Sequence, residues 1–381
     1  MFRNSKKNKT ETKSLFSTLV TLTDPAQAQW LTDTPAALEE AGFRNNPVSY
    51  RCIRMIAESA ASVPVLKTSD TPEGLVALLD RPGRGETLQS LLEMVYCDLQ
   101  VSGNSFLELV GSANGGFAGL QRIPPKCVSV PENADGWRIH TRSGKRDVRL
   151  DASGWCRILP FRALDPSLRR LGMAPLTAAR RSVEIHNAGA DWAKALIDNA
   201  ARPSGALIYG RDGAHLTPDQ FNRLKEQLDE AHTGAKNAGR PMLLEGGLEW
   251  KPMGLTPADM DYIDARREAA REIALAFGVP PMLLGIPGDN TYSNYREANL
   301  AYWRLTILPL VRKTLGRLEA WLNGARQGSI SLRPDLDAVP ALGPEREALW
   351  KRLNSADFLT RNEKREIAGL PPIEEVEGNA D

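Results

Sequence analysis

Residues 272–294 read EIALAFGVPPMLLGIPGDNTYSN, and this stretch decides how the chain is organised. It ends a helix expected over 257–277, because Gly278 stands where a C-terminal cap glycine would. Residues 279–293 are first apolar and then polar, with proline and glycine throughout, which predicts a loop. A long loop between two long helices is uncommon unless it is functional. We therefore expect this connection to carry part of the function.

The C-terminal part of the chain is predicted to be mainly helical. Asn294, with a glutamate three residues later, caps a helix expected over 295–323. Pro309 inside that helix removes a hydrogen-bond donor, so it predicts a kink. A strand over 329–332 and two short helices follow, the second of them capped by Thr360.

An alanine-rich helix is expected over 175–199, before a small insert. The insert is predicted to contain a strand at 206–209, a capped helix, and a hairpin formed by 242–244 and 248–251. The insert is followed by the helix that ends at Gly278. Two long helices that flank an insert can return alongside each other, so an antiparallel pair is predicted.

The N-terminal part is interpreted as an arm followed by an α+β domain. Residues 1–45 have little periodicity and several Lys, Thr and Asn, which indicates a flexible basic arm rather than a signal peptide. A helix is expected to begin at Asn46, whose side chain can cap it. A second helix runs from Thr87 to Gly103 and leads into a strand, so residues from about 46 to 165 form one α+β domain.

The composition excludes several classes of protein. With 381 residues the chain should form two or three domains. Its net charge of +1 shows no global basic excess, so any DNA contact must be local or weak. The four cysteines have no paired spacing and are interpreted as reduced thiols in a cytosolic protein. The sequence contains no run of 18 apolar residues, so we expect no membrane-spanning helix.

We find no catalytic motif, metal-ligand pattern or cofactor site. The fragment Ser143-Gly144-Lys145 lacks the upstream glycine and the hydroxyl residue of a phosphate-binding loop. The four histidines are far apart in sequence. Asp259, Asp261 and Asp264 cluster at a helix start, where acidic residues are favoured by the free N–H groups.

Two other functions stay open at this point. A metal-dependent nuclease would use the carboxylates of residues 259–264 and would cleave DNA with magnesium. A membrane-associated scaffold would use the basic residues 1–13 and would bind liposomes.

A series of short motifs resembles the phage portal family, in its HK97-type branch. Each block alone is weak, but together they occur in order from about residue 45 to 373. The blocks are 50–58 (YRCIRMIAE), 62–64 (SVP), 78–82 (LLDRP), 103–106 (GNSF), 172–176 (GMAPL), 199–205 (NAARPSG), 238–241 (AGRP), 244–250 (LEGGLEW), 272–281, 292–294 and 360–373. The chain departs from the family at Gly83, where asparagine is frequent, and at Ser105, where alanine is commoner.

The resemblance implies an α+β portal fold that works as a ring-shaped pore and not as an enzyme. The implied division, in chain order, is an N-terminal arm 1–45, an α+β wing 46–170, a stem helix 171–201, a small α/β clip 202–255, a stem helix 256–278, a tunnel loop 279–293, a kinked helix with the wing return 294–335, and a short helical crown and tail 336–381. A short crown fits a virus, a defective prophage or a gene transfer particle equally.

The resemblance also implies partners and site residues. The partners are about eleven further copies in a ring of about twelve, double-stranded DNA passing without sequence specificity, the terminase large subunit, the major capsid protein and the head–tail adaptor; no membrane and no cofactor is implied. The implied place is the portal vertex of the particle, after assembly in the host cytoplasm. The implied site residues are the DNA-facing Asp289, Asn290, Thr291, Tyr292, Ser293 and Asn294, the loop hinge Gly278, Pro280, Pro281, Gly285 and Gly288, and the clip contacts Arg202, Arg211, Lys225 and Arg240.

Overall fold

The computed structural model describes most of the chain outside the N-terminal arm and the insert. The described residues are 35–67, 71–83, 85–111, 117–131, 135–167, 170–198, 205–209, 217, 219, 223, 248–252, 257–287, 292–325, 329–370 and 373. Its helices are α1 (Pro35–Leu38), η1 (Glu39–Arg44), α2 (Pro47–Ala61), α3 (Glu73–Asp80), α4 (Leu88–Ser102), η2 (Pro125–Cys127), α5 (Pro175–Ala178), α6 (Arg180–Asp198), α8 (Pro257–Phe277), η3 (Pro281–Leu284), α9 (Tyr292–Tyr302), η4 (Trp303–Ile307), α10 (Leu308–Gly324), η5 (Pro340–Leu342), α11 (Gly343–Asn354) and α12 (Arg361–Ala368). Its strands are β1 (Val65–Lys67), β2 (Asn104–Gly111), β3 (Phe117–Ile123), β4 (Val128–Ser129), β5 (Gly136–Thr141), β6 (Gly144–Arg149), β7 (Ile158–Arg162), β8 (Gly205–Tyr209), β9 (Leu248–Pro252) and β10 (Leu332–Pro334).

Helices α2 and α4 form the centre of an α+β body. Asn46 caps α2 as predicted, because its Oδ1 accepts the N–H groups of Val48 and Ser49, each at 3.0 Å. Thr87 caps α4 through a capping box with Ser90. The apolar stripes of the two helices contribute to one large core that also receives side chains from α8 and α10. The two cap-based predictions in this part of the sequence are confirmed.

Helix α4 ends at a tight crossing with another segment. Gly103 has φ 73°, and a Cβ on it would lie 2.6 Å from backbone atoms of Gly172, Met173 and Ala174. Only glycine fits there, since a side chain would meet both the left-handed strain and the backbone. Asn104 reinforces the crossing by donating to the carbonyl of Gly172 and accepting from its N–H, at 3.1 and 2.7 Å.

Two three-stranded sheets cover one side of the body. Their strand orders are β3-β2-β7 and β4-β5-β6, and all pairings are antiparallel. The central strand β2 is buried over most of its length, which matches its apolar run Phe106–Leu107 and Leu109. The short strand β1 pairs instead with β10 near the C-terminus. This pairing ties the two ends of the body together.

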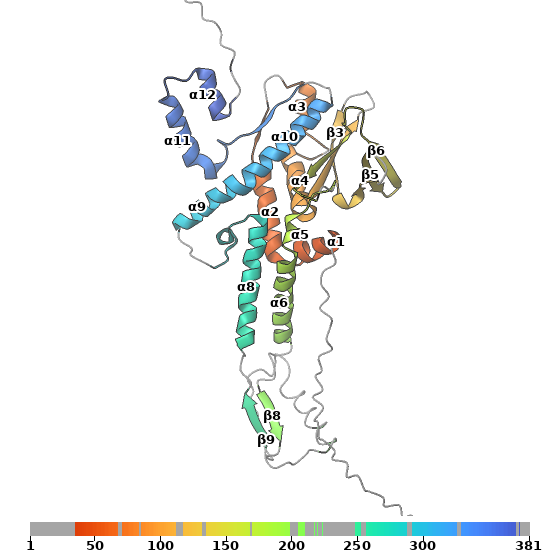
Figure 1. The fold of residues 1–381 in the computed structure, drawn as a ribbon, viewed down its shortest axis with the longest axis vertical. Helices are drawn as coiled ribbons and strands as arrows, with labels where there is room; N and C mark the ends of the chain where they lie inside the picture. The colour runs from red at the N-terminus through yellow and green to blue at the C-terminus, as the bar shows by residue number, and fades with distance from the viewer. Residues whose placement is uncertain are drawn as a thin grey trace, which may run out of the picture.

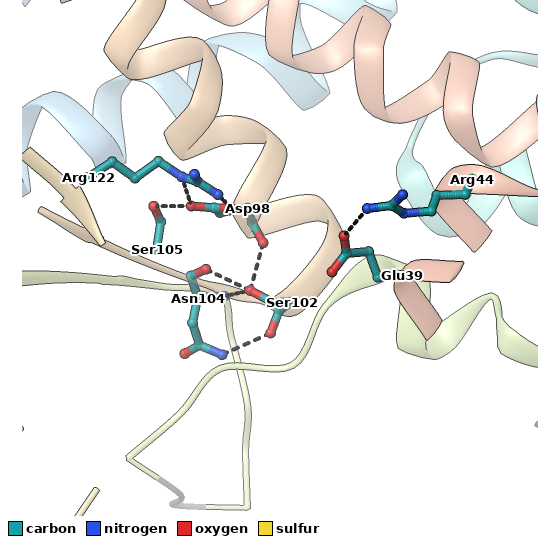
Figure 2. A network of polar contacts seen from close by, with 7 residues as sticks. All are labelled: Glu39, Arg44, Asp98, Ser102, Asn104, Ser105 and Arg122. Carbon is teal, nitrogen blue, oxygen red and sulfur yellow. Dashed lines mark hydrogen bonds and ion pairs between the residues drawn. The ribbon is translucent and has the colours of Figure 1, made fainter. Parts of the chain in front are cut away.

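A buried ion pair joins α4 to the hairpin β2–β3 (Figure 2). Arg122 on β3 binds the carboxylate of Asp98 through two nitrogens at 2.7 and 2.5 Å, and Ser105 donates to the same carboxylate at 3.0 Å. Burial raises the pKa of Asp98, while the hydrogen bonds from Arg122 and Ser105 oppose that shift. Because every oxygen of this buried carboxylate has a donor, the pair fixes the angle between helix and hairpin.

The two long helices α6 and α8 lie side by side and project from the body (Figure 1). They run antiparallel, as predicted, and the stacked rings of Trp192 and Tyr262 lie 5.0 Å apart between them. Ser182 donates to the carboxylate of Glu272 at 2.6 Å near the body. The predicted helix 175–199 is interrupted at Ala179, so α5 and α6 are separate elements.

Strand β9 pairs with β8 in antiparallel fashion, at the far end of the helix pair in Figure 1. The other strand of the predicted hairpin, 242–244, lies outside the described residues, as does nearly all of the predicted helix in the insert. The described strands thus form a two-stranded ribbon built from the first and last strands of the insert.

The long C-terminal helix begins earlier than predicted. Helix α9 starts at Tyr292 rather than after Asn294, so Asn294 lies inside its first turn. The expected irregularity near Pro309 is a π-helical segment, η4, placed just before it. Proline has no N–H to give to the preceding turn, so the hydrogen-bond pattern widens there instead of continuing. Helix α10 then packs its Leu315 and Leu318 into the core.

The four cysteines are free thiols, as predicted. Burial raises the pKa of Cys52 to about 12 and that of Cys97 to about 11. Both side chains therefore stay protonated at neutral pH and act as small apolar groups.

A buried polar joint connects α6 to the start of α2. The amide of Asn46 donates to Asn187 Oδ1 at 2.9 Å and lies 3.2 Å from His186 Nδ1. Since the Asn46 oxygen already accepts two backbone N–H groups, its nitrogen must face His186, and Nδ1 must accept. Burial, and secondarily the charge of Arg266, lower the pKa of His186.

This joint predicts a loss of stability in acid. The folded protein holds His186 neutral, whereas in the unfolded chain the imidazole takes a proton near its ordinary pKa of 6.5. The unfolded state therefore binds more protons, and the free energy of unfolding should fall as the pH drops below about 6.5. The H186N variant keeps an oxygen acceptor near the position of Nδ1 but cannot titrate.

Urea unfolding at a series of pH values from 5 to 8 measures the effect. We expect a shallower pH dependence for H186N than for the unchanged protein, whatever its stability at pH 7. The control is H140N, since His140 is exposed on β5 and contacts Ser129 rather than any residue of the joint. Equal slopes for H186N and the unchanged protein would contradict the assignment.

Candidate functional site: the connection between α8 and α9

The connection leaves α8 through a left-handed glycine. Gly278 has φ 67°, and its carbonyl accepts a hydrogen bond from Thr306 Oγ1 at 2.6 Å. The N–H of Val279 returns to the carbonyl of Ala274 at 2.9 Å, and the Val279 side chain is buried. The chain therefore turns sharply at the end of α8 and is pinned against η4.

The apolar half of the connection is a short, anchored helix. Segment η3 begins after Pro280 and ends at Gly285, which has φ 74°. Leu283 and Leu284 are half-buried against the main core. Arg271 on α8 donates to the carbonyl of Pro287 at 2.8 Å. Residues 278–287 are thus held at both ends by α8 and η4.

The predicted site residues fall into three groups. The predicted hinge residues Gly278, Pro280, Pro281 and Gly285 all lie in the anchored turn. Tyr292, Ser293 and Asn294 form the first turn of α9, where Ser293 and Asn294 are exposed. The others, Gly288, Asp289, Asn290 and Thr291 and the clip candidates Arg202, Arg211, Lys225 and Arg240, lie outside the described residues.

A hollow of about 530 Å³ lies between α8, the anchored turn and the α9–η4 helix. Two leucines on its walls are among the most exposed apolar side chains of the body: Leu275 is 79% exposed and Leu305 is 77% exposed. Sequence reasoning missed both. The available signal is that Leu275 falls outside the buried stripe of α8 formed by Ala270, Ile273 and Phe277.

The exposed face of α8 carries charges of both signs. Asp264 pairs with Arg267 at 3.4 Å, and Glu268 pairs with Arg271 at 4.0 Å. Such exposed pairs add little stability, but they leave the face close to neutral. Asp264 is therefore engaged with a cation. In the described part of the chain, no group of three or more His, Cys, Asp or Glu side chains is arranged to hold a metal ion.

The family model described as "Phage portal protein" matches residues 47–369. This match spans the body, the helix pair and the connection between α8 and α9. The chain belongs to the phage portal protein family. Among its relatives, the portal protein of Enterobacteria phage HK97 is 26% identical over 339 residues, with 85% of this chain and 78% of the phage protein covered.

Chains in solved particle necks, and a solved phage-family portal, have a similar fold. The neck of a native gene transfer agent particle, computed with C12 symmetry, matches with a TM-score of 0.69 and 44% identity, covering 91% of this chain and 96% of the other. The neck of an empty particle, computed with C6 symmetry, matches with a TM-score of 0.70 and 43% identity over 90% of this chain and 95% of the other. An HK97-family portal from Corynebacterium diphtheriae, at 19% identity and a TM-score of 0.56 over 82% of this chain and 99% of the other, shares the fold.

None of the helices described for this portal-family chain is long and apolar enough to cross a bilayer. The α+β fold implied by the sequence resemblance is confirmed, and portal proteins are structural rather than enzymatic.

The two glycines of the turn predict different responses to substitution. Both have left-handed φ, so alanine at either position should cost about 1 kcal/mol of stability. At Gly278 a Cβ would also lie 2.9 Å from Thr306 Oγ1, whereas at Gly285 it would meet nothing within 4 Å. We expect the G278A variant to lose about 1 kcal/mol more than G285A, because it also disturbs the Thr306 hydrogen bond. Urea-unfolding midpoints check this, and equal losses would show that the turn tolerates a shift of Thr306.

Proposed function

We propose that the chain forms a ring of about twelve subunits at one vertex of a phage or phage-like capsid, and that DNA enters and leaves through it. The observation that carries the proposal is the likeness, at 43–44% identity over nine-tenths of the chain, to chains in particle necks computed with C6 and C12 symmetry. Its place is then the portal vertex of the particle, and it assembles in the host cytoplasm.

In this ring, the helix pair α6–α8 is the stem beside the channel and the α+β body is the wing. The ribbon β8–β9 belongs to the clip, and α11 and α12 form a short crown. Support for the stem comes from its form: two long helices that project from the body and are joined along their length. The exposed face of α8 carries paired charges of both signs. Such a face suits a channel wall along which DNA slides, because each of these cations is paired with an acid and does not add to a continuous positive surface for successive phosphates.

The connection between α8 and α9 is proposed to meet DNA. Its anchored half, residues 278–287, positions the polar stretch that follows, Asp289 to Asn294. One polar contact per subunit is weak, but a ring repeats it around the channel. Contacts to the phosphate backbone carry no sequence information, so DNA of any sequence can pass.

The portal role also implies protein partners. The clip, with Arg202, Arg211, Lys225 and Arg240, would meet the terminase large subunit during packaging and the head–tail adaptor afterwards, while the wing would meet the major capsid protein. The chain supplies no catalytic step and needs no cofactor in this scheme; the energy for DNA movement comes from the packaging motor.

The ring proposal predicts a specific assembly defect. Native mass spectrometry of the purified protein should give a ring of about twelve copies. Leu275 and Leu305 are 79% and 77% exposed on one hollow, and in a ring the next copy can cover both of them. We expect the L275E/L305E variant to remain folded by circular dichroism but to stay monomeric.

Leu66 on β1, which is 37% exposed, provides the control. The L66E variant should still form rings. Rings of normal mass from L275E/L305E would show that the hollow lies away from the subunit contacts, and a compact dimer from the unchanged protein would count against the portal role itself.

The DNA contact is tested by removing residues 288–291. This deletion retains the residues of both anchors, Arg271 with Pro287 and Tyr292 at the start of α9. Particles should assemble but package or retain less DNA, measured as DNA per particle. A variant with four glycine and serine residues at the same positions separates loop length from side-chain chemistry. Normal DNA content in both variants would overturn the proposed contact.

A further inference from the structure

A second hollow, of about 600 Å³, lies on the body and has no lining residue from α6 or α8. It is formed by β7, α10 and the segment between β6 and β7. Most of the residues that line it are apolar, and three of them are arginines. The apolar lining includes Trp137, Leu150, Ile158, Leu159, Pro160 and Trp321, and the basic lining is Arg162, Arg170 and Arg317.

Arg317 has an unfavourable environment in the absence of a ligand. It is half-buried on α10, and across the described ranges of the chain no side chain or carbonyl forms a hydrogen bond or ion pair with it. Its pKa is lowered by burial and by the positive charge of Arg162. Within the same described ranges, Arg162 donates only to a neutral oxygen, the carbonyl of Arg170, at 3.1 Å. Two half-buried cations therefore face each other without a compensating acid.

The surroundings do not neutralise this pair. Arg170, the third arginine of the lining, pairs with Asp135 at 3.2 Å, and Asp135 is 88% exposed. Lys313, one helical turn before Arg317 on α10, lines an adjoining hollow of about 230 Å³ that shares Arg162 and Arg317. The positive charge thus extends along α10 from one hollow to the next.

The apolar wall is rigid. The indoles of Trp155 and Trp321 stack at 6.2 Å, and each N–H is occupied: Trp155 donates to the carbonyl of Trp321 at 2.9 Å, and Trp321 donates to that of Cys156 at 2.8 Å. Because both indole N–H groups already donate to backbone carbonyls, the two tryptophans offer only apolar surface to a ligand. A matching ligand therefore carries negative charge beside an apolar group.

A protein segment meets this requirement better than DNA does. Duplex DNA presents its phosphates on a convex backbone without apolar groups and cannot enter a hollow of about 600 Å³. An acidic peptide can place carboxylates on the guanidinium groups and an aliphatic side chain against the tryptophans. The chain itself contains such a stretch, Glu374-Glu375-Val376-Glu377, with three glutamates and a valine in four residues.

We propose that the hollow around Arg162 and Arg317 binds this acidic segment, 374–377, of a copy of this chain. The carboxylates pair with the two arginines and Val376 contacts the apolar wall. The contact goes beyond the channel role and does not require ring formation, but a ring would raise the effective concentration of segment and hollow.

Fluorescence anisotropy of a labelled peptide with the sequence of residues 371–381 tests the proposal. The receptor is the full-length chain in which Glu374, Glu375 and Glu377 are changed to Gln, so that its own segment does not compete. We expect the peptide to bind in a salt-dependent manner, and R317Q in the receptor to weaken binding about tenfold. The peptide with the three glutamates changed to glutamine should not bind.

R312Q is the matched control, because Arg312 is an exposed arginine on the same helix that does not line the hollow. It should leave peptide affinity unchanged. R317Q should not lower the melting temperature, since it removes a charge without a partner. The proposal is overturned if the peptide fails to bind, if its glutamine form binds equally, if R317Q and R312Q behave alike, or if duplex DNA and not the peptide binds through Arg317.

Discussion

The amide of Asn46 is the joint on which the shape of the molecule depends. Its oxygen accepts the first free N–H groups of α2, and its nitrogen meets His186 and Asn187 on α6. Asn187 in turn donates to the carbonyl of Ala41 at 2.9 Å. Because α6 and α8 are long and project from the body, a small change in their angle to the body displaces their far end, at β8 and β9, by a large distance. A buried, fully used amide fixes that angle more sharply than apolar packing, which tolerates sliding.

Local signals in the sequence predicted the elements whose ends are set by local chemistry. Asn46, Thr87 and Thr360 cap helices as expected, and Gly103, Gly278 and Gly369 end them with positive φ. The failures have tertiary causes. The break at Ala179, the pairing of β1 with β10, and the early start of α9 depend on what the chain packs against, and α3 was not predicted at all. A helix cap depends on four or five neighbouring residues, so the sequence shows it. The missed features depend on contacts with residues that are far away in the sequence.

The candidate site also has parts that the local sequence reveals and parts that only the folded structure reveals. The sequence pointed to the connection between α8 and α9, because proline and glycine between long helices are visible in one dimension. It could not show that residues 278–287 are pinned by Thr306 and Arg271, since those bonds span 28 and 16 residues. Nor could it single out Arg317 from the other basic residues: an arginine becomes distinctive only when folding places a second cation beside it and no acid.

The distribution of exposed apolar groups is best understood as a property of one subunit of a ring. Leu275 and Leu305 line one hollow between α8 and η4, while Phe358, which is 87% exposed, lies in the segment between α11 and α12. A two-fold dimer would need one self-complementary patch, but a ring uses two different faces of every subunit, so its apolar contacts are spread out. Helices α11 and α12 bury few side chains of their own, and Arg346 holds them together by binding Asp337 and the carbonyl of Ala368. These polar contacts hold the two helices in place although they bury few apolar side chains, so the exposed apolar groups beside them stay available to a neighbouring copy.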